Sequence, residues 1–336
     1  MDLRRQLAQR HVAMGPPLAV VEEDSSISAG NAAAGSSRSS GHWAPVLEWE
    51  QYYDRMKDYT LPGTDNCFRV YFGGEAKAEG GSCVFVLLHG GGHSSLSWAL
   101  TAQQLKSSAR VVAFDFRGHG HSRCKDEADL ALGTLGADTI HLTNALLAND
   151  ETVASVVLVG HSLGGAVAVF AAASERVEKL AGVVVLDVVE GTAMASLATL
   201  KSYLAQIPRS FPSIEHAIRW SIKAGMPKNR ESARVSLPPR LTEREDGKYV
   251  WRTDLSASKP YWKAWYSGMS KSFLSCKVPK LLVLAGRDRL DTELTIAQMQ
   301  GKFQLTLLPD CGHCIQEDDP ERTVRILLDM MERYGL

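Results

Sequence analysis

The chain has 336 residues, of which 45% are hydrophobic and 22% are charged. A chain of this length and apolar content is not wholly disordered, a coiled coil or collagen-like. It fits two domains, or one large α/β domain with an inserted lid. The 37 basic and 38 acidic residues leave a formal net charge of −1, which argues against general nucleic-acid binding.

The sequence predicts neither a membrane span nor a disulfide framework. No apolar run approaches the roughly 20 residues of a membrane-spanning helix, and the first 30 residues lack the apolar core of a signal peptide. The six cysteines are scattered along the chain, at positions 67, 83, 124, 276, 311 and 314. Sparse cysteines are typical of a reducing compartment, so we expect a protein of the cytoplasm and nucleus that does not bind membranes.

The amino-terminal part differs in composition from the rest of the chain. Residues 24–41 are almost all small or polar, and they cannot bury enough apolar surface to offset the entropy cost of ordering them. We therefore predict a disordered tail at residues 1–42. From residue 43 onward the composition is that of a globular domain.

Apolar runs alternate with helical patterns in the globular part. The runs that predict strands cover residues 67–72, 83–90, 110–120, 155–165, 181–187, 280–286 and 303–309. The patterns that predict helices cover residues 95–107, 126–149, 163–174, 292–299 and 320–333. This alternation predicts an α/β fold with a mainly parallel central sheet and helices on both faces.

Residues 190–272 interrupt the alternation. They contain helical patches at 195–205, 213–224 and 258–272 and no convincing strand run, so we interpret them as a helical lid inserted between two core parts, 43–189 and 273–336. Residues 201–252 carry 11 basic and 5 acidic residues, a net charge of +6, whereas the rest of the chain has −7. This charge is either a solvated helical face or a surface that attracts an acidic partner.

The strongest motif is Gly160-His161-Ser162-Leu163-Gly164, which fits the pattern G-x-S-x-G. It follows an apolar run and opens a helix of small residues, the strand–turn–helix context of a nucleophile elbow. The glycines allow a tight turn beside the serine, and the helix N-terminus favours the negative charge of a developing oxyanion. Ser162 is therefore the predicted nucleophile; the alternative is a chance pentapeptide in a tight turn.

A second glycine-rich segment, HGGG at residues 89–92, directly follows another apolar run. A loop of this type contributes one backbone N–H to an oxyanion hole, and the residue after the nucleophile contributes the other. The predicted donors are Gly91 or Gly90 together with Leu163, and His89 is predicted to lie beside the substrate. A phosphate-binding loop does not fit, because no Lys-Ser/Thr follows and the pattern G-x-G-x-x-G is absent.

The histidine base is predicted from chain order. A serine in such an elbow is followed in the chain by the acid and then by the histidine, and only His216 and His313 follow Ser162. His216 lies in a predicted lid helix, whereas His313 lies in a loop between the last strand and the last helix, so His313 is the predicted base. Cys311 and Cys314 flank it with C-x-x-C spacing, but no second pair accompanies them, which favours packing over metal or redox chemistry.

Three aspartates are candidates for the acid that orients the histidine. Asp288 follows the penultimate predicted strand, the usual place in such folds, and the pattern alone favours it. Asp187 ends the run at 181–187, beside the strand that is expected to carry Ser162. Asp291 is a third candidate.

Six segments carry a more specific signal. They are LLHGGGHSSLSWAL (87–100), GHSLGGAVAV (160–169), LDVVEGTAM (186–194), ESARVS (231–236), LAGRDRLDTELTIAQMQGKFQ (284–304) and CGHCIQED (311–318). Together they resemble the protein phosphatase methylesterase family of the α/β-hydrolase superfamily. The similarity extends from about residue 43 to the end, and DVVEGTAM and TIAQMQGKFQ are not general hydrolase features.

The resemblance implies an α/β-hydrolase that removes the methyl ester from the carboxy-terminal leucine of the protein phosphatase 2A catalytic subunit, without a cofactor or a metal. It places the family's serine and histidine at Ser162 and His313 and the acid at Asp187, and it moves our choice of acid away from Asp288. The sequence departs from the family pattern at two places. The segment before residues 249–252, a long acidic insert in animal relatives, is short here, and the amino-terminal tail shows no clear match.

Aromatic residues gather in the lid, at positions that include Trp251, Trp262 and Trp265. Trp262 and Trp265 share a helical face with Tyr266. They either pack the lid onto the core or form a wall of the substrate groove, and all three tryptophans are candidate substrate contacts. Two other functions are open: a small-molecule carboxylesterase of the same fold, and a non-catalytic scaffold that binds the phosphatase.

Overall fold

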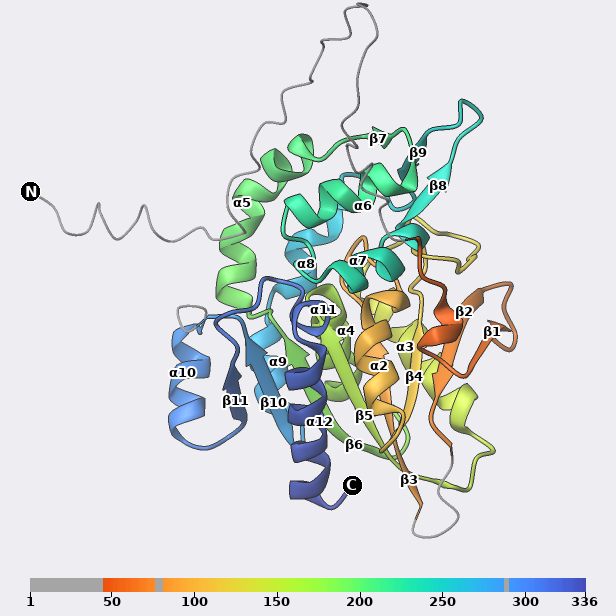
Figure 1. Ribbon diagram of the computed structural model, residues 1–336. Helices are drawn as coiled ribbons and strands as arrows, with labels where there is room; N and C mark the ends of the chain where they lie inside the picture. The colour runs from red at the N-terminus through yellow and green to blue at the C-terminus, as the bar shows by residue number, and fades with distance from the viewer. Residues whose placement is uncertain (1–44, 76–80, 287–289) are drawn as a thin grey trace, which may run out of the picture.

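The computed structural model describes residues 45–75, 81–286 and 290–336, so the predicted tail and Asp288 lie outside the described residues. Its centre is an eight-stranded sheet with the order β1-β2-β4-β3-β5-β6-β10-β11 (Figure 1). The strands are β1 (Arg55–Thr60), β2 (Cys67–Gly73), β3 (Ser82–Leu88), β4 (Arg110–Phe114), β5 (Val153–His161), β6 (Leu180–Leu186), β10 (Lys280–Leu284) and β11 (Gln304–Leu307). The β1–β2 and β2–β4 pairs are antiparallel and the other pairs are parallel.

The long apolar runs form the central strands. Every residue of β3 is buried, and so is every residue of β5 except Ala154. A parallel strand that is covered by helices on both faces needs apolar side chains at successive positions, which is why these runs do not alternate. The mainly parallel sheet is thus confirmed. The edge strand β1 was not predicted, because most of its residues are exposed and charged or polar.

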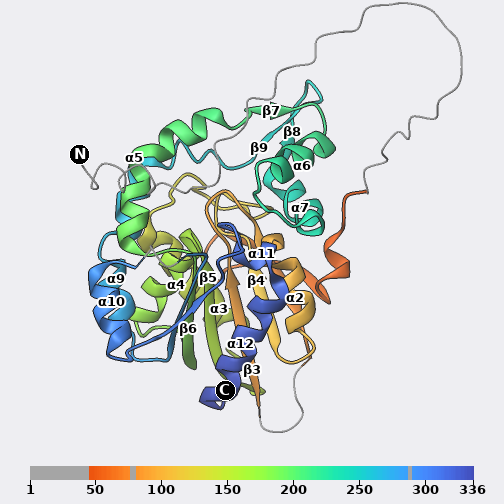
Figure 2. The ribbon, with the colours of Figure 1, turned by 60° about the vertical axis from the view of Figure 1, so that its left-hand side comes forward.

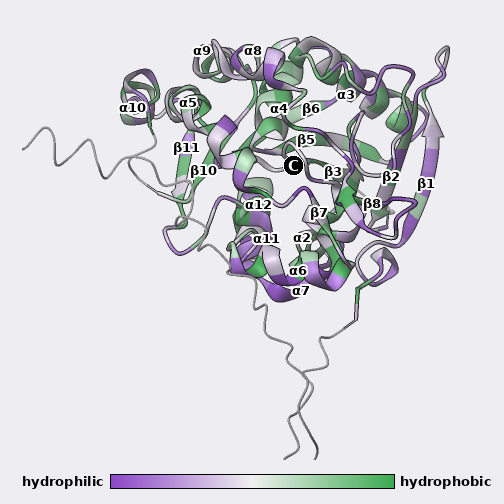
Figure 3. Ribbon diagram, turned by 90° about the horizontal axis from the view of Figure 1, so that it is seen from above, coloured by the Kyte–Doolittle hydropathy of each residue, from purple (hydrophilic) through white to green (hydrophobic). Residues whose placement is uncertain are grey.

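Helices cover both faces of the sheet (Figures 1 and 3). α3 (Leu132–Leu147), α4 (Leu163–Ala173) and α9 (Met269–Ser275) lie on one face, and α2 (Ala99–Leu105) and α12 (Pro320–Tyr334) lie on the other. α10 (Thr292–Met299) packs against α9, and α11 (Ile315–Asp318) immediately precedes α12. Among the described residues, no helix is long and apolar enough to cross a membrane.

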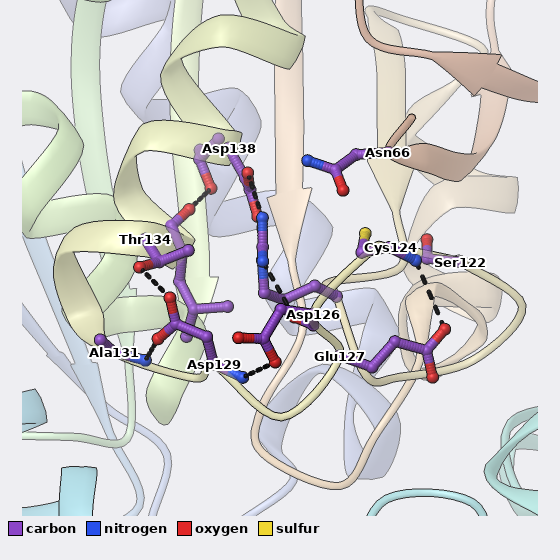
Figure 4. A network of polar contacts seen from close by, with 12 residues as sticks. Asn66, Ser122, Cys124, Asp126, Glu127, Asp129, Ala131, Thr134 and Asp138 are labelled. Carbon is purple, nitrogen blue, oxygen red and sulfur yellow. Dashed lines mark hydrogen bonds and ion pairs between the residues drawn. The ribbon is translucent and has the colours of Figure 1, made fainter. Parts of the chain in front are cut away.

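The helix predicted at residues 126–149 begins only at Leu132. In the segment before Leu132, the side chains of two aspartates accept hydrogen bonds from backbone N–H groups of nearby residues (Figure 4). Asp126 accepts hydrogen bonds from the N–H groups two and three residues later, each 3.2 Å long. Asp129 accepts one from the N–H two residues later (3.1 Å) and one from the Thr134 hydroxyl (2.7 Å). Such local bonds compete with helical hydrogen bonds, so this segment forms a loop.

The lid lies over the carboxyl ends of the parallel strands, where the chain leaves β6 and returns to β10 (Figures 1 and 2). Its helices are α5 (Glu190–Gln206), α6 (Ile214–Lys223), α7 (Arg230–Ser236) and α8 (Trp262–Tyr266). It also contains a small sheet with the order β7-β9-β8, formed by β7 (Ser210–Phe211), β8 (Leu241–Glu243) and β9 (Tyr249–Trp251). β8 and β9 are joined by an exposed turn, residues 244–248.

The small sheet was not predicted, because strands of two or three residues carry no periodic pattern. The helical patch predicted at 258–272 is divided in the structure. Gly268, with φ 77°, separates α8 from α9, and α9 continues to Ser275. Both α8 and α9 pack on the core helix α4.

Candidate active site

The predicted elbow forms between β5 and α4. Ser162 joins them with φ 53° and ψ −118°, a strained conformation for a residue with a side chain. A Cβ atom at Gly160 would overlap the carbonyl of Gly164, and one at Gly164 would overlap that of Leu88. Glycine at these two positions therefore allows strand, turn and helix to approach closely, and Ser162 is left half-buried above the sheet.

His313 and Asp187 form a hydrogen-bonded pair next to this elbow. His313 Nδ1 lies 2.8 Å from Asp187 Oδ2. The Asp187 side chain is fully buried, and its other oxygen accepts a hydrogen bond of 2.9 Å from the Ala285 N–H, which fixes the carboxylate. The Ser162 N–H donates to the carbonyl of Leu186 (3.0 Å), so the serine and the acid follow the ends of two adjacent strands.

Of the three candidate acids, the structure brings Asp187 together with His313. Asp291 instead caps the first turn of α10 with Oδ1, and its Oδ2 accepts a hydrogen bond of 2.6 Å from the Ser270 hydroxyl. Asp288, which the sequence pattern favours, lies outside the described residues. The structure thus supplies a geometric reason for the acid that the resemblance favours.

His161, which sequence reasoning did not single out, holds the loop of His313. Its Nε2 donates a hydrogen bond of 2.8 Å to the His313 carbonyl, and the two rings lie 4.8 Å apart. Burial holds the pKa of His161 well below its usual value, so its imidazole is neutral. His216, the other candidate base, is exposed on α6, where its Nδ1 lies 3.0 Å from the Ser213 hydroxyl.

The glycine-rich loop is shaped by His89. This residue is fully buried, and burial lowers its pKa to about 3, so its ring is neutral. Nδ1 donates to the Gly90 carbonyl (2.8 Å), and Nε2 accepts from the Phe116 N–H (3.0 Å). Both ring nitrogens are therefore occupied by the protein, which makes His89 a support for the loop.

Two of the candidate oxyanion donor residues, Gly91 and Leu163, lie next to each other at the elbow. A Cβ atom at Gly91 would lie 3.6 Å from Cδ2 of Leu163, an ordinary van der Waals distance. Within the described parts of the chain, the N–H groups of Gly90, Gly91 and Leu163 donate no hydrogen bond. The N–H of Gly92, by contrast, donates to His119 Nε2 (2.9 Å). The N–H groups of Gly90, Gly91 and Leu163 are thus available to donate to a substrate oxygen.

We expect Gly90→Ala to lower kcat by about 100-fold with little change in KM. Its Cβ atom would lie 2.9 Å from His161 Nδ1 and 3.4 Å from the Cβ of Ser162, so the loop must move away from the elbow. Gly133→Ala in α3 is the matched control, because a Cβ atom there meets no atom within 4 Å. Steady-state kinetics that differ by less than about twofold between the two variants would contradict this placement of the loop.

The three candidate tryptophans of the lid are packed into the protein. Trp262 and Trp265 are 5% and 4% exposed, and their indole N–H groups donate to protein oxygen atoms at 2.8 and 2.7 Å. Trp251 is half-buried and donates likewise, at 2.8 Å. Their burial and their hydrogen bonds within the protein agree with packing of the lid onto the core. Contact of these tryptophans with a substrate stays a prediction.

Tyr266 is the lid residue that reaches the nucleophile. Burial raises its pKa to about 12, and a hydrogen-bonding interaction with the Ser162 side chain opposes that shift. The phenol therefore remains protonated and can donate to the serine oxygen. In the sequence, the indication for a role of Tyr266 was its position on the same face of α8 as Trp262.

Lid residues also hold the two loops of the site. Arg240 Nε donates to the Gly92 carbonyl (2.8 Å), and its guanidinium lies 5.3 Å from the ring centre of Trp251. On the other side, Lys228 Nζ donates to the Asp310 carbonyl (2.9 Å), close to His313. The position of the lid is thus coupled to the oxyanion loop and to the histidine loop.

A cavity of about 100 Å³ opens beside the oxyanion loop, where the turn after β4 meets the lid. It is lined by Gly118, His119, His121, Ser122, Arg123, Glu127 and Arg252. The loop shown in Figure 4 contributes Ser122 and Glu127 to this lining. Two arginines against one carboxylate make the cavity suited to an anionic group.

The comparisons with known proteins agree with this geometry. A family model described as the alpha/beta hydrolase family matches residues 85–326. Among solved structures, E-2-(acetamidomethylene)succinate hydrolase superposes with a TM-score of 0.68 at 20% identity, covering 83% of this chain and 100% of that one. The thioesterase domain from the curacin biosynthetic pathway superposes with a TM-score of 0.62 at 20% identity, covering 82% and 99%. The chain therefore belongs to the α/β-hydrolase family.

More similar sequences narrow the family further. The chain is 46% identical to the probable protein phosphatase methylesterase 1 of Caenorhabditis elegans, over 86% of this chain and 77% of that protein. It is 40% identical to the protein phosphatase methylesterase 1 of Schizosaccharomyces pombe, over 86% and 85%. It is 38% identical to that of Homo sapiens, over 87% and 86%. Within the α/β-hydrolases, the chain belongs to the protein phosphatase methylesterases, which are carboxylic ester hydrolases, and the resemblance seen in the sequence is confirmed.

Proposed function

We propose that this chain removes the methyl ester from the carboxy-terminal leucine of the protein phosphatase 2A catalytic subunit, with Ser162, His313 and Asp187 as its catalytic triad. The observation that carries the proposal is the hydrogen bond between His313 and the buried Asp187 carboxylate, beside an elbow serine. The names of relatives that are 38–46% identical support the substrate class.

The reaction is acyl transfer in two stages. His313 takes the proton of the Ser162 hydroxyl while its oxygen attacks the ester carbonyl, and Asp187 stabilises the imidazolium that forms. The tetrahedral intermediate collapses, the bond to the methoxy oxygen breaks, and His313 returns its proton to that oxygen, so methanol leaves. In the second stage His313 deprotonates a water molecule that attacks the serine ester, and then returns the proton to the Ser162 oxygen as the leucine carboxylate leaves.

The elbow and the glycine-rich loop stabilise the negative oxygen of both intermediates. We assign the N–H groups of Gly91 and Leu163 as its donors, and one such donor contributes about 3–4 kcal/mol to lowering the barrier. Leu163 is also the first residue of α4, so the partial positive charge of the helix N-terminus adds to this effect.

The decisive experiment uses two substrates in parallel. The full chain is incubated with methylated phosphatase 2A catalytic subunit, and release of the methyl group is followed beside hydrolysis of a short p-nitrophenyl ester. We expect rapid demethylation. Fast cleavage of the p-nitrophenyl ester without demethylation would identify a small-molecule carboxylesterase, and binding of the phosphatase without turnover of either ester would identify a scaffold.

The basic lid supports a protein substrate with an acidic surface. Lys223 and Arg230 are exposed on α6 and α7, within the segment of net charge +6. Other basic side chains of that segment are occupied: Arg234 Nε donates to the Pro45 carbonyl (2.7 Å), and Lys228 binds the histidine loop. Lys223 and Arg230 are therefore exposed cations on two packed helices, where they can steer an acidic partner.

We expect the double variant Lys223→Glu/Arg230→Glu to slow association with the phosphatase by about tenfold at low salt, and added salt to slow the wild type as well. Lys57→Glu/Lys302→Glu is the matched control, since both lysines are exposed on the core and the change in net charge is the same. Stopped-flow or surface-based association rates provide the measurement. Equal rates for the two double variants would refute steering by the lid.

A further inference from the structure

Three metal-ligating side chains meet in the core behind the two active-site loops. They are His93, Cys314 and Glu317, which are 6%, 1% and 0% exposed. Their ligand atoms all lie within 4.8 Å of one another. We propose that these residues form a site for a divalent transition metal, with zinc as the ion that best matches the ligands, and that occupancy slows ester hydrolysis.

Two of the ligand atoms are buried without a hydrogen-bond partner among the described residues. They are Nδ1 of His93 and Oε1 of Glu317, and they lie 3.4 Å apart. Two ligands at 2.0–2.2 Å from a tetrahedral zinc ion are separated by about 3.4 Å. The pair thus already has the spacing of two zinc ligands. Their contact has the distance of an ion pair but not the geometry of a hydrogen bond, so a bound ion would give each atom a better partner.

The third ligand is a thiol that interacts with the same carboxylate. Burial holds the pKa of Cys314 above its usual value, and the charge of Arg240 opposes this shift. A metal would replace the thiol proton, as it does in other cysteine sites. Nitrogen, sulfur and oxygen donors together favour zinc and exclude calcium and magnesium, which prefer oxygen alone.

A serine of α7 holds the carboxylate of the site. The Ser232 hydroxyl donates a hydrogen bond of 2.8 Å to Oε2 of Glu317, which orients the carboxylate and leaves Oε1 toward His93. Thiolate and carboxylate together balance the charge of a divalent ion. The charge of Arg240 acts on all three ligands, so we expect moderate rather than very tight affinity.

The consequence for activity follows from where the ligands lie in the chain. His93 directly follows Gly92 of the oxyanion loop, and Cys314 directly follows His313. Bringing the ligands from 4.8 Å to tetrahedral spacing moves the segments on which the proposed oxyanion donors and base are placed. Displacements of about 1 Å at a reacting group cost up to about 100-fold in rate.

The test uses cobalt as a spectroscopic substitute and zinc as the effector. With the full-length wild-type chain, we expect one Co²⁺ per chain with a thiolate-to-cobalt charge-transfer band, a higher melting temperature with Zn²⁺, and hydrolysis of a p-nitrophenyl ester slowed by about tenfold or more and restored by chelator. Cys314→Ser should lose the band and the zinc inhibition. Cys311→Ser, a neighbouring buried cysteine outside the cluster, should retain both.

Each variant is compared with its own metal-free sample. Absence of the cobalt band in the wild type overturns the proposal, and so does a band or zinc inhibition that persists in Cys314→Ser. If Cys314→Ser does not melt cooperatively, His93→Asn removes a different ligand and is judged by the same criteria. The spectroscopic measurement needs no substrate, so its failure is separate from failure of the methylesterase proposal.

Discussion

Ser162→Ala is expected to abolish demethylation, with a loss of about 10⁴-fold or more in kcat, while the chain folds normally. The elbow conformation of residue 162 is imposed by the close approach of Gly160 and Gly164, and alanine meets the same backbone requirement as serine. The variant therefore lacks only the attacking hydroxyl. Demethylation of the phosphatase and the melting temperature are measured side by side.

A covalent probe makes the same prediction sharper. A fluorophosphonate that labels activated serines should modify the wild type once and leave Ser162→Ala unmodified. Ser107→Ala, at an exposed serine, is the matched control and should be labelled like the wild type. Demethylation by Ser162→Ala within about tenfold of the wild type would disprove its role as nucleophile.

Asp187→Asn should cost about 10⁴-fold in turnover, as loss of the triad acid does in serine proteases. Asparagine has the same size and tolerates the positive φ of 53° at this position, so the backbone is preserved. The amide can no longer hold the His313 imidazole with its Nδ1 proton toward the acid, and it stabilises the imidazolium poorly. Single-turnover demethylation measures the loss.

Two other aspartates serve as controls for Asp187→Asn. Asp291→Asn should turn over at close to the wild-type rate, because asparagine also caps a helix N-terminus and residue 291 does not contact His313. Asp288→Asn tests the position that the sequence pattern favours. If Asp288→Asn had no turnover and a normal melting temperature while Asp187→Asn remained active, our assignment of the acid would be reversed.

The parts of the fold that could be predicted are those with a strong local signal. β3 and β5 were predictable because strands covered on both faces need continuous apolar runs. The start of α3 was not, because the aspartates at 126 and 129 compete with the helix through bonds that look no different in sequence from helix-capping residues. The strands of the lid were too short to show a period.

The residues of the candidate site also divide into those with a local sequence signal and those without one. The elbow and the glycine-rich loop are contiguous motifs, so their residues were identified from the sequence. Asp187 and Asp288 each follow a predicted strand, so the strand pattern does not separate them; the family resemblance favours Asp187, and the structure adds its contact with His313. Arg240 lies in none of the motifs, and Glu317 lies in a segment of the family resemblance that assigned it no role, because their roles come from contacts between segments that are distant in the chain.

The exposed turn between β8 and β9 is a suitable site for inserting residues by protein engineering. A hydrogen bond of 2.8 Å from the Arg244 N–H to the Lys248 carbonyl closes its base, so added residues would loop outward from a fixed stem. Doubling the length of such a loop costs only about 0.6 kcal/mol. A fluorescent protein spliced between Asp246 and Gly247 should leave the hydrolase intact and convert the lid into an optical reporter of phosphatase docking.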